Sequence, residues 1–160
     1  MSSVNSADDA RRVVSLTRYP PGGTRGAGLA RAQGYGFDVA AYVERANDAV
    51  AVVVQIEHVR AVENIREILD VPGIDAVFVG PYDLSGSLGK LGRLDDHEVK
   101  SAVAAVFAAC HRQGMAYGMF AASAEAAAGP IDAGATLLAV GSDALFLGRE
   151  ARRELALVRA

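Results

Sequence analysis

The chain has 160 residues, of which 51% are hydrophobic and 22% are charged, and its formal net charge at pH 7 is −3. This composition is typical of a soluble globular domain with enough apolar material for one core. The weakly acidic charge, the absence of Trp and the aromatic content of 6% argue against a nucleic-acid-binding protein, which would be expected to be basic.

The cysteine content and the N-terminal segment bear on the compartment. Cys110 is the only cysteine, so no disulfide can form within the chain, which fits a cytoplasmic protein. Residues 1–9 are polar and acidic and lack the basic and apolar regions of a signal peptide. No apolar run reaches the length of a transmembrane helix, so we expect a cytoplasmic protein with no membrane partner.

The N-terminal third predicts two helices separated by a glycine-rich loop. Ser6 is a suitable N-cap for a helix over residues 6–19, and two aspartates follow it where the helix dipole favours negative charge. The Pro-Pro-Gly-Gly run at 20–23 ends this helix. A loop is expected over 24–37 and a second helix near 38–47.

Strands and helices alternate through the rest of the chain. Short apolar runs predict strands at 50–56, 76–79, 116–120 and 136–140, and helical spacing of apolar residues predicts helices at 59–69, 97–113, 123–133 and 145–158. A glycine-rich loop is expected at 80–92, and Pro130 should break or shorten its helix. This alternation indicates an α/β fold with a parallel sheet buried on both faces.

Two architectures fit the pattern, a (β/α)8 barrel of the TIM type and an open doubly wound sheet. Both place functional residues at the carboxyl ends of strands. No Gly-x-Gly-x-x-Gly opens a helix directly after a strand, which disfavours a dinucleotide-binding sheet. A complete barrel has eight βα units, whereas about four are expected here, so residues 1–160 are predicted to form a single partial-barrel domain.

Three polar side chains follow two consecutive strands. Gln55 and Glu57 are two residues apart and therefore point to the same face of their strand, and Asp83 lies just past the next strand. An ionised carboxylate at a buried strand end is costly unless it is paired or bound to a metal. Two carboxylates with waters and a substrate oxygen suit Mg²⁺ or Mn²⁺. The alternative is that Glu57 pairs with Arg60 and that Asp83 caps the turn at 84–88.

Four segments of the sequence, in this order, resemble the HpcH/HpaI aldolase family: Arg18-Tyr19-Pro20-Pro21-Gly22-Gly23-Thr24-Arg25-Gly26, Gln55-Ile56-Glu57, Gly73-Ile74-Asp75-Ala76-Val77-Phe78-Val79-Gly80-Pro81-Tyr82-Asp83-Leu84-Ser85 and Val140-Gly141-Ser142-Asp143. The resemblance implies a class II, metal-dependent aldolase that acts on 2-keto-4-hydroxy acids, similar to 4-hydroxy-2-oxoheptanedioate or 2-keto-3-deoxy sugar acid aldolases. It also implies an eight-stranded barrel that assembles into homo-oligomers, of which this chain supplies the fourth helix through the final helix.

The resemblance assigns roles to individual residues. Glu57 and Asp83 match the metal ligands, and two carboxylates do not discriminate between Mg²⁺, Mn²⁺ and Co²⁺. Gln55 matches a glutamine that contacts the substrate. Tyr82 matches a position whose backbone contacts the substrate carboxylate, although the family often has Ala there. Asp83 thereby belongs to both the metal site and the substrate site.

No residue of this chain matches the family's catalytic base, a histidine assisted by an aspartate, or its enolate-stabilising arginine. His58 should point away from Glu57, His97 begins a helix, and His111 lies late in a helix where positive charge suits the dipole. Lys90 and Lys100 lie in a loop and at a helix start, so neither suits a Schiff-base aldolase.

Three further features have structural interpretations beside functional ones. Cys110 lies on the apolar face of a helix and is predicted to be a core residue. Residues 141–143 precede the last helix and either cap it or bind an anion. Arg25 either faces the active site or a neighbouring subunit.

Two functions remain open on the sequence. The first is an aldolase that cleaves a 2-keto-4-hydroxy acid to pyruvate, or a related 2-keto acid, and an aldehyde. The second is a non-catalytic fragment that keeps metal and 2-keto-acid binding or only assembles through its open sheet edges.

Overall fold

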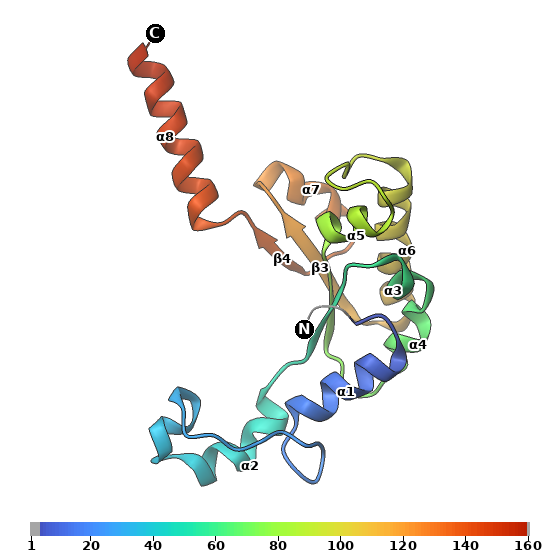
Figure 1. Ribbon diagram of the computed structural model, residues 1–160, viewed down its shortest axis with the longest axis vertical. Helices are drawn as coiled ribbons and strands as arrows, with labels where there is room; N and C mark the ends of the chain where they lie inside the picture. The colour runs from blue at the N-terminus through green and yellow to red at the C-terminus, as the bar shows by residue number, and fades with distance from the viewer. Residues whose placement is uncertain (1–3, 160) are drawn as a thin grey trace.

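The computed structural model describes residues 4–159. Figure 1 shows a small parallel sheet with helices packed along it, and two segments that project away from this body. The helices are α1 (Ala7–Thr17), the 3-10 helix η1 (Arg31–Gly36), α2 (Val39–Ala49), α3 (Val59–Glu63), α4 (Ile65–Leu69), α5 (Pro81–Ser87), α6 (His97–Gln113), α7 (Ala124–Asp132) and α8 (Asp143–Arg159).

The sheet consists of four parallel strands that lie side by side in chain order: β1 (Val53–Ile56), β2 (Ala76–Val79), β3 (Ala116–Ala121) and β4 (Leu137–Val140). Gln55 is level with Phe78 of β2, which in turn is level with Gly118 of β3. Each strand is joined to the next by at least one helix, as parallel connections require. The predicted fold class, α/β with about four βα units of the barrel type, is confirmed.

The core lies on the helix-covered face of the sheet. Val54, Ile56, Val77 and Val79 alternate along β1 and β2 and are completely buried. The helices contribute further fully buried side chains to the same cluster, namely Ile68, Leu84, Val106 and Cys110. The intervening residues of β1, Val53 and Gln55, are only partly buried, and no residue of β4 is buried. The expectation of a sheet buried on both faces is therefore wrong for these two strands.

The predicted N-cap of α1 and the predicted C-terminal end of α6 are confirmed. Ser6 caps α1 by accepting a hydrogen bond from the Asp9 amide at 3.2 Å. The predicted helix at 97–113 is α6, and Gly114 ends it in the left-handed conformation at φ 65°. Pro130 lies inside α7, which ends two residues later, so this helix is short rather than broken.

Four expectations for individual elements need correction. The expected loop at 80–92 contains α5, which begins at Pro81, a favourable first position because proline has no N–H to leave unpaired. The expected loop at 24–37 contains η1. The single helix expected at 59–69 is two short helices that meet at Asn64. The first strand begins at Val53 instead of Val50.

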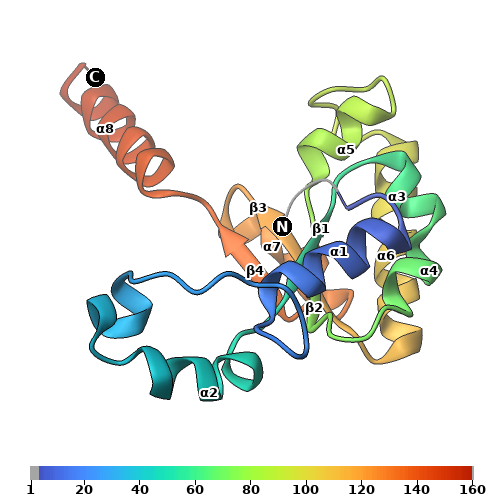
Figure 2. The same cartoon turned by 60° about the horizontal axis from the view of Figure 1, so that its bottom comes forward.

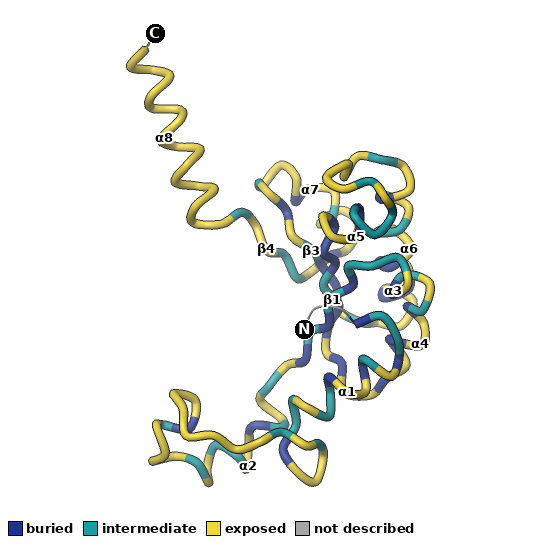
Figure 3. Tube along the Cα trace, viewed as in Figure 1, coloured by how far each residue is buried: buried dark blue, intermediate teal, exposed yellow. Residues whose placement is uncertain are grey.

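Two segments extend from the body of the molecule. Figure 2 shows α8 on one side, and η1 with α2 below it. Every residue of α8 is exposed, as the continuous yellow trace of Figure 3 shows. Within residues 4–159, none of the helices combines the length and the apolar character that a membrane span requires.

Candidate functional site

The strand register brings Gln55, Glu57 and Gly80 together. Gln55 lies on the sheet face opposite the fully buried Val54 and Ile56, and Glu57 follows β1 directly. The Gly80 amide donates to the Ile56 carbonyl at 3.0 Å, which extends the β1–β2 ladder to the level of Glu57. The predicted alternation of faces along this strand is therefore present.

Glu57 is held by its neighbour on the strand. The side-chain Nε2 of Gln55 donates to Oε2 of Glu57 at 2.6 Å. A Cβ at position 80 would lie 2.8 Å from Gln55 Nε2 and 3.3 Å from Glu57 Oε2. The absence of a side chain at Gly80 thus leaves the space in which the Gln55–Glu57 pair lies.

Asp83 lies in the first turn of α5 and is exposed. It does not cap a turn, because the N-cap of α5 is Gly80 and Asp83 is the third helical residue. Among residues 4–159, no side chain or amide forms an ion pair or hydrogen bond with its carboxylate. The capping alternative considered from the sequence is wrong for Asp83, and its oxygens are accessible to a ligand.

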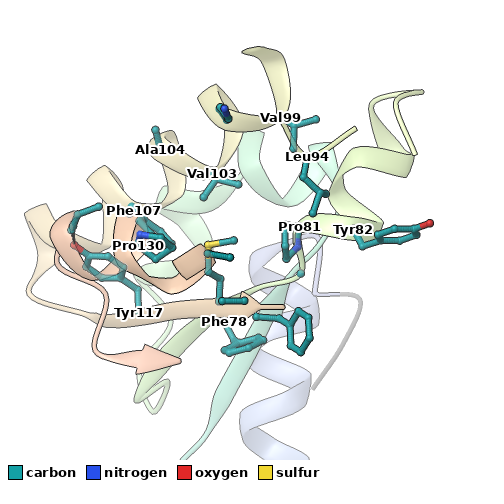
Figure 4. Close-up of a pocket in the computed structure, with 18 of the residues that line it drawn as sticks. Phe78, Pro81, Tyr82, Leu94, Val99, Val103, Ala104, Phe107, Tyr117 and Pro130 are labelled. Carbon is teal, nitrogen blue, oxygen red and sulfur yellow. Dashed lines mark hydrogen bonds between the residues drawn. The ribbon is translucent and has the colours of Figure 1, made fainter. Parts of the chain in front are cut away.

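A hollow of about 1340 Å³ adjoins this strand end. Gln55, Gly80 and Asp83 line it together with apolar side chains from β2, β3, α6 and α7. In Figure 4, Pro81 and Tyr82 lie on one side of the hollow, and Phe107, Tyr117 and Pro130 lie on the other. Tyr82 is 57% exposed, and its ring lies beside Gly92.

The donor set fits a divalent cation that keeps part of its water shell. Mg²⁺ in proteins is bound through one or two carboxylates plus waters and substrate oxygens. Within residues 4–159, no group of three or more His, Cys, Asp or Glu side chains is arranged around one point. Glu57 and Asp83 are the two carboxylates that this strand end offers to such a cation, and Gly80 leaves space beside Glu57. Their role as metal ligands stays a prediction.

His97 and His111 have the positions that the sequence predicts, whereas His58 caps a helix instead of continuing the strand. His58 is the N-cap of α3, and its Nδ1 accepts a hydrogen bond from the Arg60 amide at 3.1 Å. His97 is the first residue of α6, and His111 lies in the last turn of that helix. These contacts give His58 a structural role at the start of α3.

The lysines do not suit Schiff-base chemistry. Lys90 lies 2.8 Å from a carboxylate oxygen of Asp96 and 2.6 Å from one of Glu98. These hydrogen bonds raise the pKa of Lys90, whereas a nucleophilic lysine needs a lowered pKa. Lys100 lies 2.8 Å from the carboxylate of Asp95.

The structure also shows the contacts of Cys110, Ser142 and Arg25, which the sequence analysis considered as candidates. Cys110 is completely buried in the core, and this burial raises the pKa of its thiol to about 11. Ser142 accepts a hydrogen bond from the Leu145 amide at 3.2 Å, so it caps α8. Arg25 stacks on Tyr19, with its guanidinium carbon 4.6 Å from the ring centroid, and on Tyr42 at 5.7 Å.

Sequence reasoning missed two serines near the candidate site. Ser85 is completely buried, and its hydroxyl donates to the Tyr82 carbonyl at 2.6 Å. The hydroxyl of Ser87 accepts a hydrogen bond from the Val59 amide at 3.0 Å. The signal available in the sequence was two serines on either side of Gly86, directly after a predicted carboxylate ligand.

The chain is similar to two groups of curated aldolases. It is 40% identical to the hydroxypyruvate/pyruvate aldolase of Paraburkholderia phytofirmans, over 99% of this chain and 62% of that protein. It is 40% identical to the 4-hydroxy-2-oxo-heptane-1,7-dioate aldolase of Escherichia coli, over 92% of this chain and 57% of that protein. The chain thus spans less than two thirds of the length of these relatives.

A solved structure and a family model agree with these similarities. An HpcH/HpaI aldolase/citrate lyase family protein from Burkholderia cenocepacia superposes with a TM-score of 0.94 at 41% identity, over 100% of this chain and 64% of that chain. The model of the HpcH/HpaI aldolase/citrate lyase family matches residues 2–148. The chain therefore belongs to the HpcH/HpaI aldolase/citrate lyase family.

Proposed function

We propose that this chain carries the metal-binding part of an aldolase site that cleaves a 2-keto-4-hydroxy acid to pyruvate, or a related 2-keto acid, and an aldehyde. The observation that supports it most directly is the grouping of Gln55, Glu57, Gly80 and the accessible Asp83 at the carboxyl ends of β1 and β2. The similarity to two aldolases supports this reaction class.

In this proposal Glu57 and Asp83 bind Mg²⁺ or Mn²⁺, with Co²⁺ as a further candidate. A bound divalent cation supplies Lewis acidity toward the keto and carboxylate oxygens of the substrate. Gln55 uses one N–H of its amide to orient Glu57 and keeps a second N–H for a substrate oxygen. Tyr82 is the second residue of α5, so its amide is one of those that helical bonding leaves for a ligand.

Residues 1–160 are proposed to form one partial-barrel domain that acts in the cytoplasm as a homo-oligomer, with small molecules as its ligands. The projecting helix α8, exposed along its whole length, supports the oligomer because a lone amphipathic helix gains stability mainly from packing. Nucleic acid is not among the proposed partners, since the net charge is −3.

A second candidate function is metal and 2-keto-acid binding without turnover. The contact of His58 favours this candidate. Its Nδ1 accepts a hydrogen bond from the Arg60 amide, so this nitrogen is not available for proton transfer. The two candidates share the same carboxylates and differ only in whether a carbon–carbon bond breaks.

Mn²⁺ titration of the purified chain, followed by the electron paramagnetic resonance of the free ion, tests the site. We expect Glu57→Gln and Asp83→Asn each to weaken Mn²⁺ binding by more than tenfold. Asp48→Asn, an exposed carboxylate on α2, is the matched control and should leave binding unchanged. Equal Mn²⁺ affinity in all four proteins would refute the proposed metal site.

Pyruvate release from 4-hydroxy-2-oxo-heptane-1,7-dioate, with Mn²⁺ present, separates the two candidates. Turnover above the rate with free Mn²⁺, and lost in Glu57→Gln, supports the aldolase. Mn²⁺ and pyruvate binding without turnover supports the second candidate.

A further inference from the structure

We propose that Ser87 is a positioning residue that fixes the turn carrying Glu57 against the helix carrying Asp83. This inference rests on the metal-binding role proposed above for the two carboxylates. The proposal concerns a hydrogen-bonded connection, beyond the backbone ladder, between the segments that follow β1 and β2.

The hydroxyl of Ser87 joins the two segments directly. It accepts a hydrogen bond from the Val59 amide at 3.0 Å and donates to the Leu84 carbonyl at 2.8 Å. Val59 lies two residues after Glu57, and Leu84 directly follows Asp83. One hydroxyl therefore spans from the Glu57 turn to the Asp83 helix.

The Val59 amide has no alternative partner within its own helix. Val59 is the first residue of α3, and the first four N–H groups of a helix lack an intrahelical acceptor. The N-cap residue His58 satisfies the next amide, that of Arg60, at 3.1 Å. Ser87 thus completes the capping of α3 from a different βα unit.

Ser85 also holds α5 in place. Its hydroxyl donates to the Tyr82 carbonyl at 2.6 Å and accepts from the Gly92 amide at 2.9 Å, and its side chain is completely buried. The sequence of α5 contains one proline, one glycine and two serines, which are weak helix formers. The orientation of Asp83 therefore depends on these tertiary hydrogen bonds more than on helix propensity.

A purely structural role and a positioning role predict different results. Loss of a neutral hydrogen bond lowers the free energy of unfolding slightly and leaves the folded protein otherwise intact. Loss of a positioning contact also lowers cation affinity under conditions where the protein is fully folded. Outer contacts of metal sites typically change metal affinity by about 10- to 100-fold.

The experiment measures Mn²⁺ affinity of the full chain, by the same titration as above, in two variants that remove the bond from opposite sides. Ser87→Ala removes the acceptor. Val59→Pro removes the N–H donor, and proline is favourable at the first helical position, where the preceding His58 already has an extended conformation with φ −141° and ψ 145°. Ser87→Thr keeps the hydroxyl, and Ser101→Ala on the exposed face of α6 is the control.

We expect Ser87→Ala and Val59→Pro each to weaken Mn²⁺ binding about tenfold, and the double variant to be no weaker than either single one. Ser87→Thr and Ser101→Ala should bind as the unaltered chain does. In Ser87→Ala, hydrogen exchange of the Val59 amide should also become faster while circular dichroism stays unchanged.

Three outcomes would contradict these expectations, and each refutes the positioning role of Ser87, the metal site or both. Unchanged Mn²⁺ affinity in Ser87→Ala and Val59→Pro overturns the positioning role while the metal site stands. Additive losses in the double variant also overturn it, since the two changes then act separately. An unaltered chain that binds no Mn²⁺ refutes the proposed metal site itself, and the positioning role with it.

Discussion

Gly80 lies against Glu57 so closely that a Cβ at position 80 would be 3.1 Å from the Glu57 Cβ. The φ of Gly80 is −96°, which any residue can adopt, so an alanine there is constrained by its neighbours and not by the backbone. We expect Gly80→Ala to displace the Gln55–Glu57 pair and to weaken Mn²⁺ binding about tenfold. Gly129→Ala, with no neighbour near its added methyl group, is the control for calorimetric titration.

Gln55→Leu should loosen Glu57 without removing a metal ligand. The 2.6 Å hydrogen bond from Gln55 is lost, while a side chain of similar size fills the space. We expect Mn²⁺ affinity to fall several-fold and the fall to be smaller than in Glu57→Gln. An effect as large as that of Glu57→Gln would contradict a supporting role for Gln55 at the metal.

Lys90→Met should change the response of folding to acid. Hydrogen bonds from Lys90 and from the Glu98 amide lower the pKa of Asp96, so ionised Asp96 stabilises the fold above its ordinary pKa and loses this effect as the pH falls through its folded value. Urea unfolding should show Lys90→Met less stable than the unaltered chain at neutral pH, with a smaller difference at about pH 3. Arg12→Met serves as the control, and a difference that is independent of pH would count against this account.

Cys110 should limit stability in alkali. Its pKa is raised by burial from 9.0 to about 11, so the folded state keeps the proton that the unfolded state loses. Stability is therefore constant with respect to this group below pH 9 and falls by about 2 to 3 kcal/mol as the pH rises to 11. Cys110→Ala should lack this fall in alkaline urea titrations. Native Cys110 should also react with a thiol reagent only after unfolding, and rapid native labelling would be inconsistent with its burial.

Helix α8 should control the oligomeric state. Leu147, Leu155 and Val158 are 74%, 47% and 84% exposed and lie on a helix with no buried residue. We expect Gln at all three positions to lower the mass measured by sedimentation velocity, because exposed apolar side chains of this kind are typical of association surfaces. Arg152→Gln, also on α8, should leave the mass unchanged. A monomeric unaltered chain would refute the proposed homo-oligomer.

The sequence predicts the strands and α6 well because their signals are local. Apolar runs form the strands, with β-branched residues prominent in β1 and β2, and α6 combines helical spacing with Gly114, whose left-handed conformation ends the helix. The face shared by Gln55 and Glu57 follows from the two-residue period of a strand. The roles of Gln55, Tyr82, Glu57 and Asp83 in binding stay predictions.

The sequence does not predict α5 or the contacts around it, because these depend on residues that are distant in the chain. Pro81, Ser85, Gly86 and Ser87 together favour a turn, yet the chain forms a helix that Ser85 and Ser87 hold in place. The Ser87–Val59 bond joins positions 28 apart, which no local pattern reveals. For the same reason the sequence does not predict that Arg25 stacks on Tyr19 and Tyr42, and whether it faces a site or a neighbouring subunit stays open.

The four strands lie side by side in the order in which they occur in the chain. Neighbouring parts of the candidate site are therefore also neighbours in the gene, and recombination can transfer them together. Every residue proposed to hold the cation or to orient its ligands lies between Gln55 and Gly92, in two adjacent βα units. Recombination that moved only this stretch would carry the whole ligand-holding apparatus, while substrate preference and assembly could evolve in the segments on either side.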